Sequence, residues 1–180
     1  GSQESSFREG QSTELKCVLD HLIANGEMKP MIVVAPTFYP GGGADSSVRT
    51  AERLVTRFPD ELVNDLLPAV EGTYSSYAES TDEDGLKSSR GHRAFGGFSM
   101  GSVTTWYVFM EKLDYFRTFL PISGDCWAVA MQGGASHPEE TAGVLEQVLQ
   151  DSGYSGKDFY IYAMTGTDDI AYEMMDKQIR

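Results

Sequence analysis

Apolar residues follow two different spacings along the chain, and their alternation predicts a sheet flanked by helices. Continuous apolar runs, typical of strands that are buried on both faces, occur at Met31–Ala35, Phe119–Ile122 and Phe159–Met164. The stretches between them carry apolar residues three and four positions apart, a spacing that predicts helices. The expected helices cover roughly residues 15–23, 60–67, 102–112, 141–149 and 170–179. Strands that alternate with helices favour an α/β fold with a mostly parallel sheet.

A fourth, Gly-rich strand is predicted at His92–Phe98, and it leads into the pentapeptide Gly97–Gly101. The pentapeptide matches G-x-S-x-G, the sharp strand-to-helix turn that exposes a nucleophilic serine at the carboxyl edge of a sheet. Glycines at both of its ends lack a Cβ, which permits a strained backbone there. The helix expected after it completes the context that the motif requires. Ser99 is therefore the candidate nucleophile, and the Met100 N–H is the expected oxyanion donor.

A serine nucleophile needs a base, normally a histidine that a carboxylate orients. The carboxylate is expected in a loop at the carboxyl end of a later strand. Asp168 and Asp169 follow one apolar run, and Asp125 follows another. Each of them could instead be a loop carboxylate, and Asp168 or Asp169 would also suit the N-cap of a helix over residues 170–179. The residues alone leave the three acids as alternatives.

No histidine occupies the position that this mechanism expects. In this fold the base follows the acid along the chain, yet no histidine follows Asp169. His21 belongs to the first predicted helix, and His92 lies at the opposite end of its strand from Ser99. His137, in the loop after the Asp125 strand, is the remaining candidate, but it is out of order and disfavoured. No His/Cys/Asp cluster has the spacing of metal ligands, so we expect no metal and no cofactor.

Length and charge restrict the class of protein and its partners. A chain of 180 residues predicts one domain. The run Met31–Ala35 is far shorter than the roughly 20 residues of a membrane span. A formal net charge of −13 argues against nucleic acid, because binding phosphates requires a basic face. An acidic surface is compatible with a neutral carbohydrate or an aromatic ester. Aromatic residues expected near the mouth of the site, and suited to stacking on such groups, are Tyr39, Tyr74, Tyr77 and Trp127.

Three blocks of the sequence resemble feruloyl esterase modules of carbohydrate esterase family 1, esterase D-like α/β-hydrolases that are appended to bacterial xylanases. The blocks are Leu19–Tyr39, His92–Trp127 and Thr165–Tyr172. The resemblance implies an α/β-hydrolase that cleaves feruloyl esters on plant cell-wall arabinoxylan through an acyl-enzyme, with acetyl esters as second candidates. By position it also implies that Ser99 is the nucleophile and Asp169 the acid, with Asp168 as its rival. Asp125 and Trp127 would then line the substrate pocket.

The chain departs from the family pattern at both ends. Family members have a strand and a His-Gly-Gly type oxyanion loop before the first block, and a catalytic histidine in a Gly-His-Trp-like stretch after the last. Neither is found in this sequence. We therefore expect residues 1–180 to be a single, partial esterase domain that lacks its base and second oxyanion donor. Such a chain would be inactive alone unless another histidine, such as His137, substitutes.

Three further expectations follow. An incomplete sheet exposes a strand edge, which predicts a homodimer that pairs through it. An enzyme that acts on plant polymer is expected to be secreted. Two alternative functions retain the fold: a non-catalytic carbohydrate-binding or interaction module, and an enzyme similar to thioesterases or formylglutathione hydrolases.

Overall fold

The computed structural model describes residues 13–37 and 47–180, and the chain forms two compact units, residues 1–40 and residues 41–180. In the first unit, α1 (Glu14–Ala24) confirms the helix predicted over residues 15–23. The hydroxyl of Thr13 caps its start by accepting a hydrogen bond from the Lys16 N–H (3.4 Å). Gly26, with φ of 73°, follows its end. No described helix is long and apolar enough to cross a membrane.

The strand predicted at Met31–Ala35 is wrong. Residues 29–37 have no regular secondary structure, and the side chains of the apolar run are exposed. A strand is held by a ladder of hydrogen bonds to a neighbouring strand. No described residue supplies such a ladder to this segment, so its β-branched composition alone does not make it a strand.

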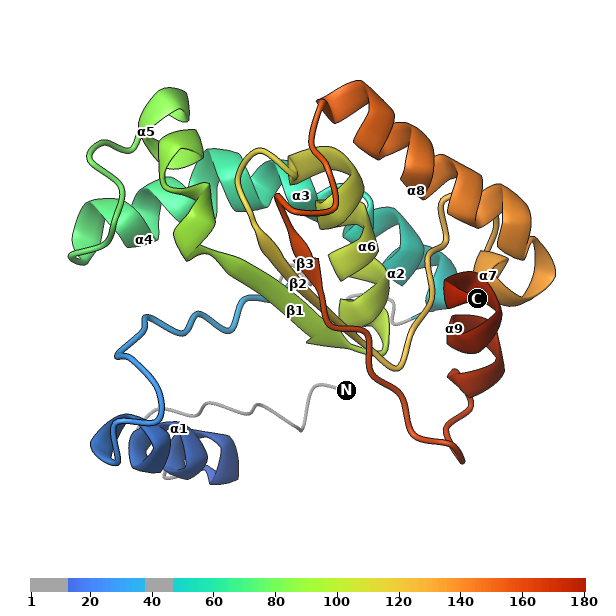
Figure 1. The fold of residues 1–180 in the computed structure, drawn as a ribbon, viewed down its shortest axis with the longest axis horizontal. Helices are drawn as coiled ribbons and strands as arrows, with labels where there is room; N and C mark the ends of the chain where they lie inside the picture. Colours follow the sequence, from blue (N-terminus) through green and yellow to red (C-terminus); the bar gives the residue numbers. More distant parts are fainter. Residues whose placement is uncertain (1–12, 38–46) are drawn as a thin grey trace. The chain divides into compact units, whose positions relative to one another are not determined.

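The second unit is built on a three-stranded parallel sheet in the order β1–β2–β3 (Figure 1). The strands are β1 (Ala94–Phe98), β2 (Thr118–Ile122) and β3 (Tyr160–Ile161). An isolated bridge between Ile122 and Met164 extends the pairing of β2 beyond the end of β3. The remaining predicted strands therefore form, in the parallel arrangement that the alternation of elements predicts. The run at β3 is less buried than its composition predicts, because Tyr160 and Ile161 are both exposed.

Helices flank the sheet close to where the sequence predicts them. α6 (Met100–Lys112) joins β1 to β2 and packs against both strands. α8 (Pro138–Ser152) and α9 (Tyr172–Ile179) correspond to the two helices expected after β2 and β3. The helix predicted over residues 60–67 belongs to a longer helical segment. That segment consists of α3 (Phe58–Glu61), the π-helical turn η1 (Leu62–Leu66) and α4 (Leu67–Thr73).

Four short elements are not predicted by the pattern. They are α2 (Val48–Val55), α5 (Glu83–Ser88), the 3₁₀ turn η2 (Arg90–His92) and α7 (Gly133–Ser136). Each spans at most two turns of helix, so the apolar spacing has too few repeats to be recognised. Asp82 shows the local cause for α5, because its carboxylate caps the helix by accepting a hydrogen bond from the Gly85 N–H (2.9 Å).

An aromatic cluster holds α6 against the sheet. Phe109 of α6 meets the ring of Phe119 on β2 edge-on, with a centroid distance of 5.1 Å. It also meets Phe159, just before β3, at 5.5 Å, and Trp106 at 6.5 Å. Edge-to-face pairs contribute about 0.5–1.5 kcal/mol beyond the area that they bury. The cluster therefore fixes the position of the helix that begins at the candidate nucleophile.

A buried ion pair anchors the entry to β1. The guanidinium of Arg93 contacts the carboxylate of Glu71 on α4, and both side chains are less than 10% exposed. Arg93 also donates to the Ser89 hydroxyl (2.5 Å) and to the carbonyls of Leu86 and Tyr115. Burial raises the pKa of Glu71, but hydrogen bonds from Arg93 and Ser76 and the Arg93 charge outweigh it, so the pKa lies below its ordinary value of 4.5.

Replacing Glu71 by glutamine is expected to lower the free energy of unfolding by about 3 kcal/mol, because the buried Arg93 charge loses its partner. Since the pKa of Glu71 is lower in the folded state, its contribution is fully present above pH 4.5 and is lost as the pH falls through the folded pKa. Urea denaturation from neutral to acidic pH measures both effects. The difference between wild type and Glu71→Gln should disappear in acid.

Glu79→Gln provides the matched control, because Glu79 is exposed and carries the same charge. It should leave the stability within about 0.5 kcal/mol of wild type. Equal effects of the two substitutions would contradict a special role for the Glu71–Arg93 pair.

Candidate active site

Ser99 lies on a sharp turn between β1 and α6, with φ of 58° and ψ of −117°. A positive φ is uncommon for a residue with a side chain, and such strain gathers at functional sites. The turn is held on both sides. The Ser99 N–H donates to the Ile122 carbonyl (2.9 Å), and the Ser99 carbonyl accepts from the N–H groups of Ser102 (2.8 Å) and Val103 (3.1 Å). Ser99 itself is exposed at the carboxyl edge of the sheet.

The two glycines of the pentapeptide have different roles. A Cβ on Gly97 would lie 2.5 Å from the carbonyl carbon of Gly101, so no side chain fits there. A Cβ on Gly101 would meet no atom within 4 Å. The close passage of helix and strand therefore depends on Gly97 alone. The expectation that the turn requires both glycines holds for Gly97 and is wrong for Gly101.

Gly97→Ala is expected to reduce the free energy of unfolding by about 2–3 kcal/mol, because the clashing atoms belong to the backbone and cannot rotate away. Gly101→Ala is the matched control, and it should leave stability unchanged or slightly raise it, because alanine favours a helix over glycine. Thermal and urea unfolding of the two variants test this. Similar destabilisation by both would contradict the assignment of the constraint to Gly97.

The first turn of α6 presents an available donor beside Ser99. Among the described residues, no acceptor is bonded to the Met100 N–H, the first of the helix. Helix N-termini carry a partial positive charge, which favours an anion placed against them. The geometry thus suits the Met100 N–H for stabilising negative charge next to the Ser99 hydroxyl.

The loop after β2 is fixed to the same turn. Gly124 passes so close that a Cβ there would lie 2.7 Å from the Ser99 carbonyl oxygen. The Gly124 carbonyl accepts hydrogen bonds from the Ser102 hydroxyl (2.6 Å) and the Trp106 indole (3.0 Å). Ser123, the residue before it, also has a left-handed φ, of 53°. The loops after β1 and β2 therefore form one rigid unit.

Asp125, one of the three candidate acids, is fully buried, with 1% of its surface exposed. Its Oδ2 accepts from the Gly134 N–H (2.7 Å), and its Oδ1 accepts from the Trp127 indole (3.0 Å). A Cβ on Gly134 would lie 2.8 Å from the Asp125 Cβ, so the two segments are packed tightly. These contacts favour a structural role, in which Asp125 ties α7 and Trp127 to the end of β2.

Burial also sets the protonation of two groups close to this loop. It raises the pKa of the Cys126 thiol to about 11 and that of the Tyr107 hydroxyl to about 12. The Tyr107 hydroxyl donates to the Trp127 carbonyl (3.2 Å), which suits its neutral form. A buried neutral thiol is inert as a nucleophile. Cys126 is therefore no competitor of Ser99 for that role.

Asp168 and Asp169 lie in the loop that follows β3 and its bridge at Met164. Asp168 is exposed. Asp169 is half-buried, and its Oδ1 accepts from the Ala171 N–H (2.8 Å) in the turn that leads into α9. Because the three strands are parallel, this loop and Ser99 lie at the same edge of the sheet. Asp169 thus has a fixed orientation and lies at the edge of the sheet where an acid is expected. The same hydrogen bond also suits the alternative interpretation, in which Asp169 stabilises the start of α9.

Each of the three histidines makes a contact that does not involve Ser99. The Nδ1 of His21, on α1, is 2.7 Å from the Cys17 carbonyl oxygen. His92 stacks on Tyr77, two residues before β1 begins. The exposed His137 has its Nδ1 2.9 Å from the Ser136 hydroxyl, at the start of α8. None of these contacts involves Ser99 or an acid of the site. Within the described residues, no group of three or more His, Cys, Asp and Glu side chains could hold a metal ion.

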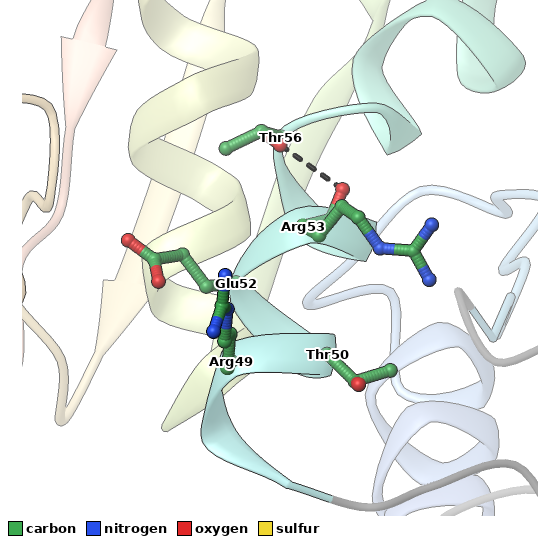
Figure 2. A pocket seen from close by; sticks show the side chains of 5 residues that line it. All are labelled: Arg49, Thr50, Glu52, Arg53 and Thr56. Atoms are coloured by element: carbon green, nitrogen blue, oxygen red, sulfur yellow. Dashed lines mark hydrogen bonds between the residues drawn. The ribbon is translucent and has the colours of Figure 1, made fainter.

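One expectation about the surroundings of Ser99 is wrong: Tyr77 lies by His92, at the amino end of β1, and not near the mouth of the site. Tyr39, also expected near the mouth, lies outside the described residues. A hollow of about 560 Å³ lies on α2, not at Ser99 (Figure 2). Its lining residues are Arg49, Thr50, Glu52, Arg53 and Thr56. It contains none of the predicted site residues.

Comparison with known proteins finds relatives of the chain in sequence and in structure. Endo-1,4-beta-xylanase Y of Acetivibrio thermocellus is 41% identical over 179 residues, which make up 99% of this chain and 15% of the xylanase. A serine-to-alanine mutant of the feruloyl esterase module from Clostridium thermocellum, complexed with sinapinate, is 42% identical, with a TM-score of 0.78. A second solved structure, of a protein named FAE, matches with the same identity and TM-score. No protein-family model matches the chain.

The match to the solved structures covers 92% of this chain and 53% of each of theirs. The chain therefore spans about half the length of the solved structures and a much smaller part of the xylanase. The likeness, together with the parallel sheet and its flanking helices, shows that the chain has an α/β-hydrolase fold, as predicted.

Proposed function

Since the chain is similar to a feruloyl esterase module over 92% of its length, we propose that it carries the nucleophile of a serine esterase that hydrolyses feruloyl esters on xylan. The observation that carries the proposal is the turn at Ser99. The serine is exposed, strained at φ of 58°, and placed between a strand end and a helix N-terminus. The glycine at position 97 is needed only because the backbone makes this sharp turn, and a buried serine in a relaxed conformation would not require it.

The proposed reaction is acyl transfer in two steps. The Ser99 hydroxyl attacks the ester carbonyl, a base takes its proton, and the oxyanion that forms accepts a hydrogen bond from the Met100 N–H. The base then protonates the departing sugar oxygen, which leaves a feruloyl group on Ser99. Water deprotonated by the same base hydrolyses this ester and releases ferulate. We assign the base to neither His92 nor His137, because none of their contacts involves Ser99 or a candidate acid.

We propose Asp169 as the acid that orients the base. Its loop lies at the same edge of the sheet as Ser99, and the bond from the Ala171 N–H leaves Oδ2 available to a partner. Asp168, its exposed neighbour, remains the alternative. Asp125 is assigned a supporting role, because both of its oxygens already accept hydrogen bonds. In this role it positions Trp127, which we place at the substrate pocket.

The names of the similar proteins support the choice of substrate. One is a xylanase, and one is a feruloyl esterase module complexed with sinapinate. Sinapinate, like ferulate, is a methoxylated hydroxycinnamate, so a pocket for one suits the other. Xylan in plant cell walls is too large to enter a cell, and we therefore propose that the protein acts outside it.

Hydrolysis of methyl ferulate by the natural protein that carries these residues tests the assignment. Ser99→Ala should reduce kcat by about 10⁶-fold. Asp169→Asn should reduce it by about 10⁴-fold, because the base then loses its orientation. Asp168→Asn is the matched control and should change kcat less than about threefold. Activity that survives Ser99→Ala would overturn the proposal, and reversed effects at the two aspartates would move the acid to Asp168.

Asp125→Asn is expected to separate the structural carboxylate from the catalytic one. The amide nitrogen cannot accept one of the two hydrogen bonds, which should cost about 1–3 kcal/mol of stability in so buried a place. Asp169→Asn should cost less, because its Oδ1 can still accept from Ala171. Chemical denaturation of both variants provides the measurement. A stable but inactive Asp125→Asn protein would instead identify Asp125 as the acid.

The predicted homodimer remains a proposal. Among the described strands, β1 pairs only with β2, so its other edge offers backbone groups to a second chain. Light scattering over a range of concentrations should then show a dimer. A clean monomer at high concentration would contradict the pairing.

A further inference from the structure

An exposed pair of stacked rings stands at the amino end of the sheet. The rings of Tyr77 and His92 are nearly parallel, at an angle of 7°, with their centroids 3.7 Å apart. Tyr77 is 67% exposed although the imidazole covers one of its faces. Its other face must therefore be open to solvent. We call these two residues the Tyr77–His92 platform.

A single carboxylate holds both halves of the platform in place. One oxygen of Glu71 pairs with Arg93, the residue directly after His92. The other accepts a hydrogen bond from the Ser76 hydroxyl (2.6 Å), directly before Tyr77, and that hydroxyl accepts from the Ala78 N–H (3.1 Å). The buried ion pair thus fixes an aromatic surface that points into water. Pre-organisation of this kind reduces the entropy lost when a ligand binds.

The charges around the platform select the kind of ligand. Residues 74–84 contain four acidic side chains and no lysine or arginine: Glu79, Asp82, Glu83 and Asp84. The basic side chains that follow are already bonded: Lys87 pairs with Glu83 and Asp114, and Arg90 donates to three backbone carbonyls. The remaining carboxylates disfavour phosphates and other anions. A flat, open ring suits a flat apolar partner, and carboxylates suit hydroxyl donors. A pyranose combines the two, because one side of the sugar ring is made of C–H groups and its rim carries hydroxyls.

We infer that the Tyr77–His92 platform is a binding site for a neutral polysaccharide chain, separate from the candidate active site. β1 has five residues and lies between His92 and Ser99, so the two sites are about 17 Å apart or more. α5 and the start of β1 lie together at this end of the sheet, away from the carboxyl ends of the strands (Figure 1). A polymer held here would raise the local concentration of its ester groups at Ser99. The choice of xylan as the polymer rests on the proposed function, whereas the platform does not.

Calorimetric titration of the chain with xylohexaose, which carries no ester, tests the inference without any catalysis. Tyr77→Ala should weaken binding at least about fivefold, because the stacking face is removed. Tyr77→Phe should bind like wild type, because it retains the face. Tyr74→Ala is the matched control: Tyr74 is also an exposed tyrosine, at 59%, but it stacks on no ring among the residues that the structure describes. Each substitution is at the surface, and thermal unfolding verifies that the variants fold.

Three results would overturn the inference. They are no binding of xylohexaose by the wild type, equal weakening by Tyr74→Ala and Tyr77→Ala, and tighter binding of a nucleotide such as AMP than of the sugar. In the natural protein that carries these residues, Ser99→Ala separates this site from the proposed esterase function, because it should abolish hydrolysis while binding of xylohexaose is retained. An active esterase that binds no xylohexaose would contradict the platform alone.

Discussion

The absence of a side chain at Gly97 is the constraint on which the arrangement of this site depends. The backbone at Gly97 passes so close to Gly101 that there is no room for a Cβ at position 97. This close passage allows α6 to start directly at the end of β1. Ser99 then adopts a positive φ of 58°, and the residue is exposed at the carboxyl edge of the sheet. The strain is retained because hydrogen bonds to β2 and to the first turns of α6 hold the turn. The exposed serine, the free helix N-terminus and the close approach of Gly124 all follow from this passage.

Burial separates the polar groups around the sheet into those that stabilise the fold and those that are accessible for a reaction. Asp125 and Arg93 are buried, and their hydrogen-bonding groups already have several partners within the fold. Ser99 and Asp168 are exposed, and Asp169 retains one unbound oxygen. A group that is to react needs access and an unused bonding capacity. This contrast favours a structural role for Asp125 and supports the proposal that the acid comes from the loop after β3.

The two ends of the sheet offer different chemistry. At the carboxyl end, parallel strands bring Ser99 and the acidic loop to a common edge. At the amino end, Glu71 links α4, the Tyr77 loop and the residue before β1 through one buried carboxylate. That end therefore presents a rigid aromatic surface, which we infer binds sugar. A protein that both cleaves esters and holds their polymer would use the two ends together.

The sequence by itself determined the turn at Gly97–Gly101, the parallel sheet and most helices, because their signals are local. The glycines of a tight turn and an apolar spacing of about 3.6 residues can both be recognised from residues that are close together in the sequence. The tertiary structure decided whatever depends on partners far apart along the chain. Met31–Ala35 has the composition of a strand, but it has no ladder among the described residues and forms none. Asp125 and Asp169 look alike in sequence, and only their burial separates them. Tyr77 meets His92, fifteen positions later, because a carboxylate on a third segment holds both loops.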